Sequence, residues 1–460
     1  MWIPTLDEGH PTVSGRLLGA LRRDIENGTL PPGTRLPPHR ELAHRLGIGI
    51  GTVTAVYGEA ARQGLLSATV GRGSFVADRS APMSSVYDPE GGAIDLAQNL
   101  PPSAPAQRRS AATLAKLSRR ADTGLLLDYA PPAGHERHRQ AAAAWIRRIG
   151  GLGDARADRM VITDGAQQAM LYALGALCRP GDTVLTESAT YFGIRSIAQT
   201  CDLKLVGLDM DEQGIMPEAL ERAAQSGARV LYTMPTLQNP TGRTMGDARR
   251  RDIAALARKH GLSIVEDDLY SAFAAGFAPP PLAGYAPERT LYINGTSKAL
   301  APGLRTGYLI LPDADLLDRV LRQVRAHVYA PCAIGPTIAC QWMEDGSADD
   351  IMAEIGEELA ARGDIARQVL GDAFVPPDDR RCPHLWLPLP ELDAERLAAR
   401  AMRAGVKLTP PSAPLIEPQL ISGVRLCLGP ASDRAQLRGA LERLACGLDA
   451  DHPEPAAAVV

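Results

Sequence analysis

Apolar and polar positions follow two different rhythms along the chain. Residues 14–27 and 50–63 place apolar side chains three and four positions apart, the spacing of helices that bury one face. Beyond Gly150, short apolar runs such as 183–185 and 263–265 alternate with helical patterns. Short buried strands separated by helices are typical of a mostly parallel sheet covered by helices. The pattern predicts a helical N-terminal part followed by a larger α/β part.

The same pattern marks the boundaries of these parts. Residues 79–93 are rich in Ser, Pro, Gly and Asp and carry almost no apolar periodicity, which is typical of an exposed linker. After about residue 375 the rhythm changes to that of a smaller α+β unit. The predicted parts are an N-terminal domain over 10–78, the linker over 79–93, a large domain over 94–345, a small domain over 346–447 and a flexible tail over 448–460.

Composition excludes several classes of protein. The 460 residues are 45% hydrophobic and 22% charged, with a formal net charge of -4, as in ordinary globular proteins. No run of about 18 apolar residues occurs, and the N-terminus lacks a basic and then apolar leader, so we expect a cytoplasmic protein without a membrane partner. The seven cysteines show no CxxC pair and no metal-ligand spacing, which predicts reduced thiols and no metal site.

Two short helices across a glycine turn are predicted in the N-terminal part. One helix follows Pro37–Pro38, and Gly47 then turns the chain into the next helix, which begins near Ile50. Residues 70–76, Val-Gly-Arg-Gly-Ser-Phe-Val, predict a hairpin with Arg72 at its tip. Together these elements form a winged helix-turn-helix.

Residues 14–76 resemble the winged helix-turn-helix of GntR-superfamily regulators. The shared pattern is Gly-x-Leu-x-x-Gly, Leu-Pro, Arg-Glu-Leu-Ala, Leu-Gly, Thr-Val, Tyr and Gly-Arg-Gly-x-Phe-Val, in that order from Gly28. The resemblance implies that Arg40 and Thr52 contact DNA phosphates or bases and that Arg72 enters the minor groove. Residues 10–78 contain eight arginines and five acidic residues, and the resulting positive net charge favours binding to the negatively charged DNA backbone.

The chain departs from this pattern where the recognition helix begins. The family usually carries Ser-Arg there, whereas this chain has Gly49–Ile50, followed by Gly51. A phosphate or guanine contact is therefore missing, and the glycines weaken the helix. One alternative to DNA binding is a degenerate module kept for dimerisation or docking.

The segment 296–307 concentrates chemistry suited to an aldehyde that carries a phosphate. Lys298 lies directly after Ser297 and seven positions before Arg305, so an amine, a hydroxyl and a guanidinium can converge. A lysine forms a Schiff base with an aldehyde, and an arginine binds a phosphate with two hydrogen bonds, while the serine adds a donor. These needs are those of pyridoxal 5'-phosphate (PLP).

Three other fragments suit the same cofactor. In Asn239-Pro-Thr-Gly, the turn would place the Asn amide near the cofactor's phenolic oxygen. Asp267 ends a buried strand, where a carboxylate can keep the pyridine nitrogen protonated, and Asp268 is the alternative. The residues Gly165, Ala166 and Gln167 lie between a strand and a helix, where main-chain N–H groups form a phosphate cradle.

Residues 94–447 resemble the fold-type I aminotransferases, whose lysine, Asn-Pro-Thr-Gly and aspartate motifs occur here in the same order. The family's spacing of three residues between the aspartate and a tyrosine favours Asp267 over Asp268. The further roles that the resemblance implies are Tyr270 on the phenolic oxygen with Asn239, Tyr191 stacked on the pyridine ring, Arg425 on an α-carboxylate, and Tyr129 on the phosphate of a partner subunit.

Joined together, the two parts resemble a MocR-type regulator. The resemblance implies a DNA-binding transcription factor that senses PLP or an amino compound through the Lys298 Schiff base, with DNA, an amino acid or amine effector and a second copy of the chain as partners. A sensor of PLP alone is a variant of this hypothesis. The alternative is an aminotransferase or related amino-acid enzyme with a vestigial DNA-binding module, because every group that transamination needs is present.

Overall fold

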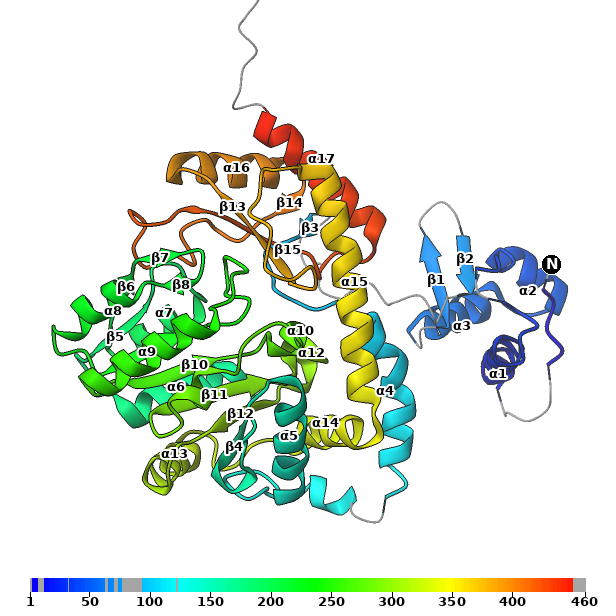
Figure 1. The fold of residues 1–460 in the computed structure, drawn as a ribbon. Coiled ribbons are helices and arrows are strands. Elements are labelled where there is room, and N and C mark those ends of the chain that lie inside the picture. The colour runs from blue at the N-terminus through cyan, green and yellow to red at the C-terminus, as the bar shows by residue number, and fades with distance from the viewer. Residues whose placement is uncertain are drawn as a thin grey trace, which may run out of the picture. The chain divides into compact units, whose positions relative to one another are not determined.

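The computed structural model describes residues 2–6, 12–31, 33–62, 65–69, 73–76, 93–120 and 123–449. They divide into two compact units, Met1–Tyr87 and Asp88–Val460 (Figure 1). The predicted wing tip Arg72, nearly all of the predicted linker and most of the predicted tail lie outside the described residues.

The N-terminal unit is a winged helix-turn-helix, as the sequence predicts. Three helices, α1 (Val13–Glu26), α2 (His39–Leu46) and α3 (Ile50–Arg62), precede an antiparallel hairpin of β1 (Leu66–Thr69) and β2 (Gly73–Val76). The first strand of the hairpin lies upstream of the expected range of 70–76. Apolar residues from all three helices and both strands fill one core, which includes Leu17, Leu21, Leu42, Ala43, Val53, Val56, Tyr57, Ala60, Leu66 and Val76.

The turn between α2 and α3 depends on one glycine. Gly47 ends α2 with φ 64°, in the left-handed region that favours glycine. Its N–H reaches back to the carbonyls of Ala43 and His44, which caps the helix. The phenol of Tyr57 on α3 donates to the carbonyl of Pro37, 3.0 Å away, and thereby ties α3 to the start of α2.

A seven-stranded sheet organises the second unit. All neighbouring strands are parallel except β12, which runs antiparallel to both of its neighbours. The strands of the sheet, in spatial order, are β4 (Met160–Thr163), β12 (Gly307–Ile310), β11 (Thr290–Gly295), β10 (Ser263–Asp267), β9 (Val230–Thr233), β5 (Thr183–Glu187) and β6 (Lys204–Leu208).

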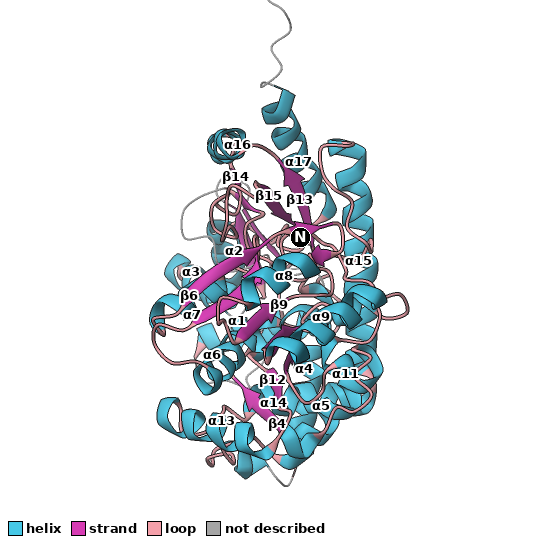
Figure 2. Cartoon of the chain, turned by 60° about the vertical axis from the view of Figure 1, so that its left-hand side comes forward, coloured by secondary structure: helices cyan, strands magenta, loops and turns pink. Residues whose placement is uncertain are grey.

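Helices lie on both sides of this sheet (Figures 1 and 2). Successive strand residues point to opposite faces, so Val184 and Val265 join the core that contains α5, α6 and α13, whereas Leu185 and Ile264 join the core under α8, α9 and α11. The helices of this part are α4 (Ala104–Leu117), α5 (Glu136–Ile149), α6 (Ala166–Leu177), α7 (Gly193–Thr200), α8 (Pro217–Ala224), α9 (Asp247–His260), α10 (Ser271–Ala274), α11 (Leu282–Tyr285), α12 (Thr296–Ala299), α13 (Ala314–His327) and α14 (Ile334–Asp345).

The C-terminal part is smaller and mixed. Its strands β13 (His384–Pro388) and β15 (Gly423–Cys427) pair antiparallel, with α15 (Ser347–Leu370), α16 (Glu391–Arg403) and α17 (Arg434–Asp449) beside them in Figure 1. The short strand β14 (Val406–Lys407) pairs in parallel with β3 (Ile94–Asp95). The first strand of the second unit is therefore attached to the C-terminal part.

The predicted fold class is confirmed, with a winged helix-turn-helix and a fold-type I aminotransferase-like unit in one chain. No helix within the described ranges is both long and apolar enough to cross a lipid bilayer.

Candidate functional site

Several predicted site residues of the second unit lie at or after the carboxyl ends of the parallel strands. Asp267 is the last residue of β10, and Lys298 lies in α12, directly after β11. Asn239 follows β9, and Gly165 follows β4. Open parallel sheets bind ligands at this edge.

Asp267 is buried and has one carboxylate oxygen without a partner. Its Oδ2 accepts a hydrogen bond of 3.0 Å from the Tyr232 hydroxyl, whereas Oδ1 has no partner among the described residues. Burial raises the pKa of Asp267 to about 7. The hydrogen bond from Tyr232 and the charge of Lys298 act in the opposite direction. A buried acceptor without a donor fits the protonated nitrogen of a pyridine ring.

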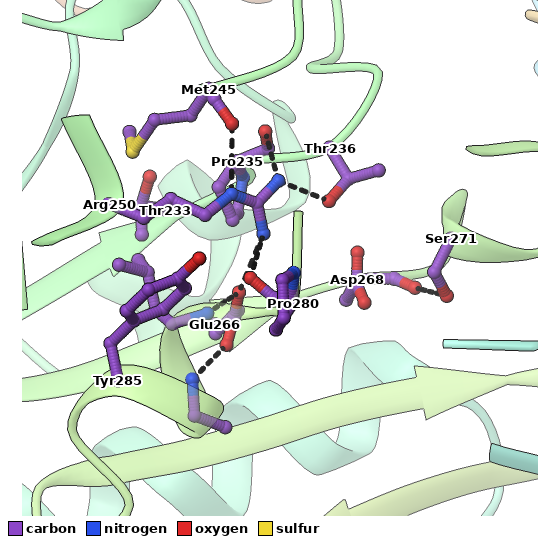
Figure 3. Close-up of polar contacts among 12 residues, drawn as sticks. Thr233, Pro235, Thr236, Met245, Arg250, Glu266, Asp268, Ser271, Pro280 and Tyr285 are labelled. Carbon is purple, nitrogen blue, oxygen red and sulfur yellow. Dashed lines mark hydrogen bonds and ion pairs between the residues drawn. The ribbon is translucent and has the colours of Figure 1, made fainter. Parts of the chain in front are cut away.

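Asp268, the alternative at this position, belongs to a different network. Its Oδ2 accepts from the Tyr292 hydroxyl at 2.8 Å, and its main-chain oxygen accepts from Ser271 at 2.9 Å. Figure 3 shows the adjoining cluster, in which the Arg250 guanidinium lies 3.9 Å from Glu266. Burial raises the pKa of Asp268 to about 6. Asp268 Oδ1, like Asp267 Oδ1, has no hydrogen-bond partner among the described residues, so the choice of Asp267 for the pyridine nitrogen stays a prediction.

Lys298 is half-buried, and its amine donates to the main-chain oxygen of Asn99. Burial, together with the charges of Arg425 and Arg305, lowers the pKa of the Lys298 amine to about 8. A lowered pKa increases the fraction of neutral amine at neutral pH, and the neutral amine is the form that attacks an aldehyde. Ser297, beside it in α12, is also half-buried.

A cradle for a phosphate lies at the start of α6. Gly165 caps this helix with φ 97°, and the main-chain N–H groups of Ala166 and Gln167 belong to its first turn, which has no intrahelical acceptors. The Arg305 guanidinium donates to the Asp164 carbonyl at 2.8 Å. A Cβ atom at Gly165 would stand 2.7 Å from Arg305 Nη2, so glycine lets the guanidinium approach the helix end.

Arg425 and Asn239 are brought together. Arg425 is buried on β15, and its Nη1 donates to Asn239 Oδ1 at 2.9 Å, while Nη2 donates to the Ala97 carbonyl at 2.8 Å and the Thr409 hydroxyl at 3.0 Å. The guanidinium carbon lies 5.9 Å from the centre of the Phe192 ring. An anionic group at this point would meet a preorganised guanidinium.

Tyr191 and Tyr270 flank the same region. Tyr191 is half-buried, and the negative charge of Asp267 adds to burial in raising its pKa. Tyr270 is buried, and its hydroxyl accepts from the Asn99 amide at 2.9 Å. Tyr129 differs from both, because it is 82% exposed and packs edge-on against Tyr329. Within one chain it does not join the buried group, and its role toward a partner subunit stays a prediction.

Sequence reasoning missed two residues that support the site. The Asn99 amide contacts both the Tyr270 hydroxyl and Nδ1 of His384, the latter at 3.1 Å. Nε2 of His384 lies 3.0 Å from the Gln238 carbonyl, so it carries the proton, and burial lowers the His384 pKa to about 3. Asn99 comes after the short strand β3 and lies 171 positions from Tyr270, so no local sequence pattern marks it as a site residue.

The predicted DNA contacts are only partly described. Arg40 is exposed on α2, and Thr52 is half-buried in the first turn of α3. Arg72 lies outside the described residues, so its contact stays a prediction. No cluster of three or more His, Cys, Asp or Glu side chains suited to a metal ion occurs in the described part of the chain.

The residues present fit PLP. Asp267 has a buried acceptor without a donor that suits a pyridinium N–H, Lys298 supplies an amine of lowered pKa, and the first turn of α6 with Arg305 suits an anion. The individual residue roles remain predictions from the sequence, now with a geometry consistent with them.

Comparison with known proteins gives the same two-part description. Residues 14–76 match the bacterial regulatory proteins of the gntR family, and residues 92–444 match aminotransferase class I and II. The uncharacterized HTH-type transcriptional regulator YdeF of Bacillus subtilis is 32% identical over 316 residues, which is 68% of this chain and 67% of YdeF. The HTH-type pyridoxine biosynthesis transcriptional regulator PdxR of Corynebacterium glutamicum is 26% identical over 381 residues, 80% of this chain and 81% of PdxR.

Solved structures support the fold of the second unit. An archaeal alanine:glyoxylate aminotransferase superposes with a TM-score of 0.71 at 24% identity, covering 77% of this chain and 90% of that one. The kynurenine aminotransferase of Pyrococcus horikoshii gives 0.70 at 23% identity, covering 78% and 92%. The chain belongs to the aminotransferase class I and II family and carries an N-terminal domain of the gntR family of bacterial regulators.

Proposed function

We propose that the chain is a PLP-dependent, DNA-binding transcriptional regulator that senses PLP or an amino compound at Lys298. The observation that carries this proposal is the joining, in one chain, of a gntR-family domain to a buried donor set with a free acceptor on Asp267. An enzyme does not need a DNA-binding domain, whereas a regulator that senses PLP needs both the DNA-binding domain and the PLP-binding unit.

PLP bound at this site supplies an aldehyde for amines and an electron-withdrawing ring. The residues of the chain would each have a task in holding it. Asp267 Oδ1 would accept the proton of the ring nitrogen, and Arg305 with the first turn of α6 would bind the phosphate. Asn239 and Tyr270 would lie near the phenolic oxygen, and Tyr191 would cover one face of the ring.

The effector class follows from Arg425. The buried guanidinium of Arg425 can bind the carboxylate of an amino acid. The amino group of that amino acid would then lie at the site of the Lys298 amine. Amino acids are therefore the proposed effectors, with PLP itself as the simplest signal. The carboxylate would compete with the Asn239 side chain and the Ala97 carbonyl for Arg425.

The DNA side of the proposal uses the winged unit. Exposed Arg40 and half-buried Thr52 would contact phosphates or bases, and Arg72 would enter the minor groove. We propose a homodimer, in which Tyr129 reaches the phosphate of the partner, because paired winged units would bind paired half-sites.

We also propose a cytoplasmic location, because a promoter-binding protein must reach the DNA. The domain boundaries predicted from the sequence stay proposals, with β3 assigned to the small C-terminal part because it pairs with β14.

An aminotransferase is the second candidate function. The pKa of Lys298, about 8, suits an amine that both gives and takes protons near neutral pH. The family match of residues 92–444 supports the same reading. In this alternative the winged unit would be vestigial, and the chain would turn over an amino acid and an oxo acid.

Binding of the purified chain to its own upstream DNA, followed by fluorescence anisotropy, separates the two candidates. The duplex is titrated with and without PLP over a series of salt concentrations, beside a scrambled duplex. A regulator gives PLP-sensitive affinity above that for the scrambled DNA. Weak binding that ignores sequence, together with turnover of amino donors, would favour the enzyme.

A further inference from the structure

The exposed face of the recognition helix is uncharged. Among residues 50–60 of α3, the exposed positions are Ile50, Gly51, Thr54, Ala55 and Gly58, and none can carry a charge. The Thr54 hydroxyl is already engaged, because it lies 3.1 Å from Nδ1 of His39. Donors that usually read base edges, such as Arg, Asn and Gln, are absent from this described face.

Ile50 is the one large side chain on that face. It is 49% exposed and lies in the first turn of α3, the end of a recognition helix that contacts base edges. Gly51 and Gly58 leave open space beside the helix, since a Cβ at either position would meet no atom within 4 Å. The helix backbone can therefore approach a surface closely, with the isoleucine projecting toward it.

Basic side chains that suit phosphates are exposed on the helix that packs against α3. Arg35, Arg40 and Arg45 are exposed on α2 and the segment before it. Arg45 pairs with Glu41 at 3.4 Å, so Arg35 and Arg40 are the proposed phosphate contacts. Contacts to phosphates position a protein on DNA, whereas base edges determine sequence preference.

The only apolar feature on a base edge in the major groove is the C5-methyl group of thymine. We propose that Ile50 reads this methyl group, so that the chain selects thymine at one position of each half-site by an apolar contact. The proposal rests on the DNA-binding function proposed above and adds a residue that determines specificity. Gly49 and Gly51 would then be part of the reading surface.

The test begins with the full-length chain loaded with PLP and a pool of random duplexes, from which bound sequences are selected. Each thymine of the selected site is then replaced, one at a time, by deoxyuridine, which lacks only the methyl group. Loss of one buried methyl contact should lower the affinity by about fourfold. The thymine that behaves in this way is expected once per half-site.

Two variants assign the effect to the side chain. Ile50→Ala should reduce the deoxyuridine effect to below about 1.5-fold, as expected when a contact has already been removed. Ile3→Ala is the matched control, because Ile3 is 48% exposed in the same unit, and it should keep the fourfold effect. Unchanged affinity for a scrambled duplex checks that the winged unit of each variant is folded, and visible absorbance of bound PLP checks that the second unit is loaded.

Two results would overturn the inference. If the chain selects a sequence but no thymine methyl matters, or if the effect persists undiminished in Ile50→Ala, then Ile50 does not read thymine although DNA binding stands. If the pool yields no enriched sequence, the DNA-binding function fails together with the inference.

Discussion

The Arg425 guanidinium donates a hydrogen bond of 2.9 Å from Nη1 to the Oδ1 of Asn239, and the two residues lie 186 positions apart. The bond joins a strand of the small C-terminal part to the loop after β9 of the large sheet. A second bond from Arg425 reaches the carbonyl of Ala97. A ligand carboxylate that takes over these bonds would act on both parts of the unit at once.

Replacement of Arg425 tests this role. In Arg425→Ala, the amino-acid concentration that gives a half-maximal spectral change should rise by about 30-fold or more, because truncating a buried charged partner costs about 2–5 kcal/mol. PLP binding should persist. Titration of amino acids against the visible spectrum measures the effect, with exposed Arg222→Ala as the control. Equal responses in both variants would exclude Arg425 as the carboxylate site.

The two adjacent aspartates should respond differently to amidation. Asp267→Asn removes the charge that stabilises a protonated ring nitrogen, so the absorbance of bound PLP should shift and its affinity should fall by about tenfold or more. Asp268→Asn should leave the spectrum unchanged, because its carboxylate contacts Tyr292 instead. Spectra and PLP titrations of the two variants provide the comparison. A spectral change in Asp268→Asn alone would reverse the assignment.

The lowered pKa of Lys298 predicts a pH dependence for PLP binding. The amine pKa falls from 10.5 to about 8, so the neutral amine accumulates as the pH rises through 8. The rate at which PLP becomes bound to the apo chain should therefore rise between pH 7 and pH 9 and then level off. Stopped-flow absorbance across this range measures it. A rate still rising steeply above pH 10 would show an ordinary lysine.

Arg40 should contribute to DNA affinity without regard to sequence. Arg40→Ala should weaken binding to specific and scrambled duplexes by a similar factor and reduce the salt slope by about 1. Anisotropy over a salt series measures both quantities. Arg156→Ala, an exposed ion-pair arginine in the other unit, is the control. A loss confined to the specific duplex would instead make Arg40 a reader of bases.

Local sequence determined much of the fold and part of the site. Lys298 and Asp267 could be placed because each follows a short apolar run that the sequence marks as a buried strand. Gly47 and Ile50 could be placed in the same way from a turn between two helical patterns. Such signals involve neighbours in the chain, so periodicity and turn chemistry suffice.

Contacts between distant segments gave no such signal. The strand β3 has only two residues and pairs with β14, more than 300 positions later, so no period could reveal it. Asn99 and His384 meet at a separation of 285 positions. The contact between Asn99 and His384 forms only when the large and small parts pack together, and local sequence patterns do not reveal that packing.

Dependence of DNA affinity on PLP, compared between the wild-type chain and Lys298→Ala, tests the central claim most directly. Anisotropy with the upstream duplex is measured at one salt concentration while PLP is added. PLP should change the wild-type affinity by about tenfold, whereas Lys298→Ala should show no change and no visible absorbance band. A wild-type affinity that ignores PLP, or an equal response in Lys298→Ala, would contradict the central claim.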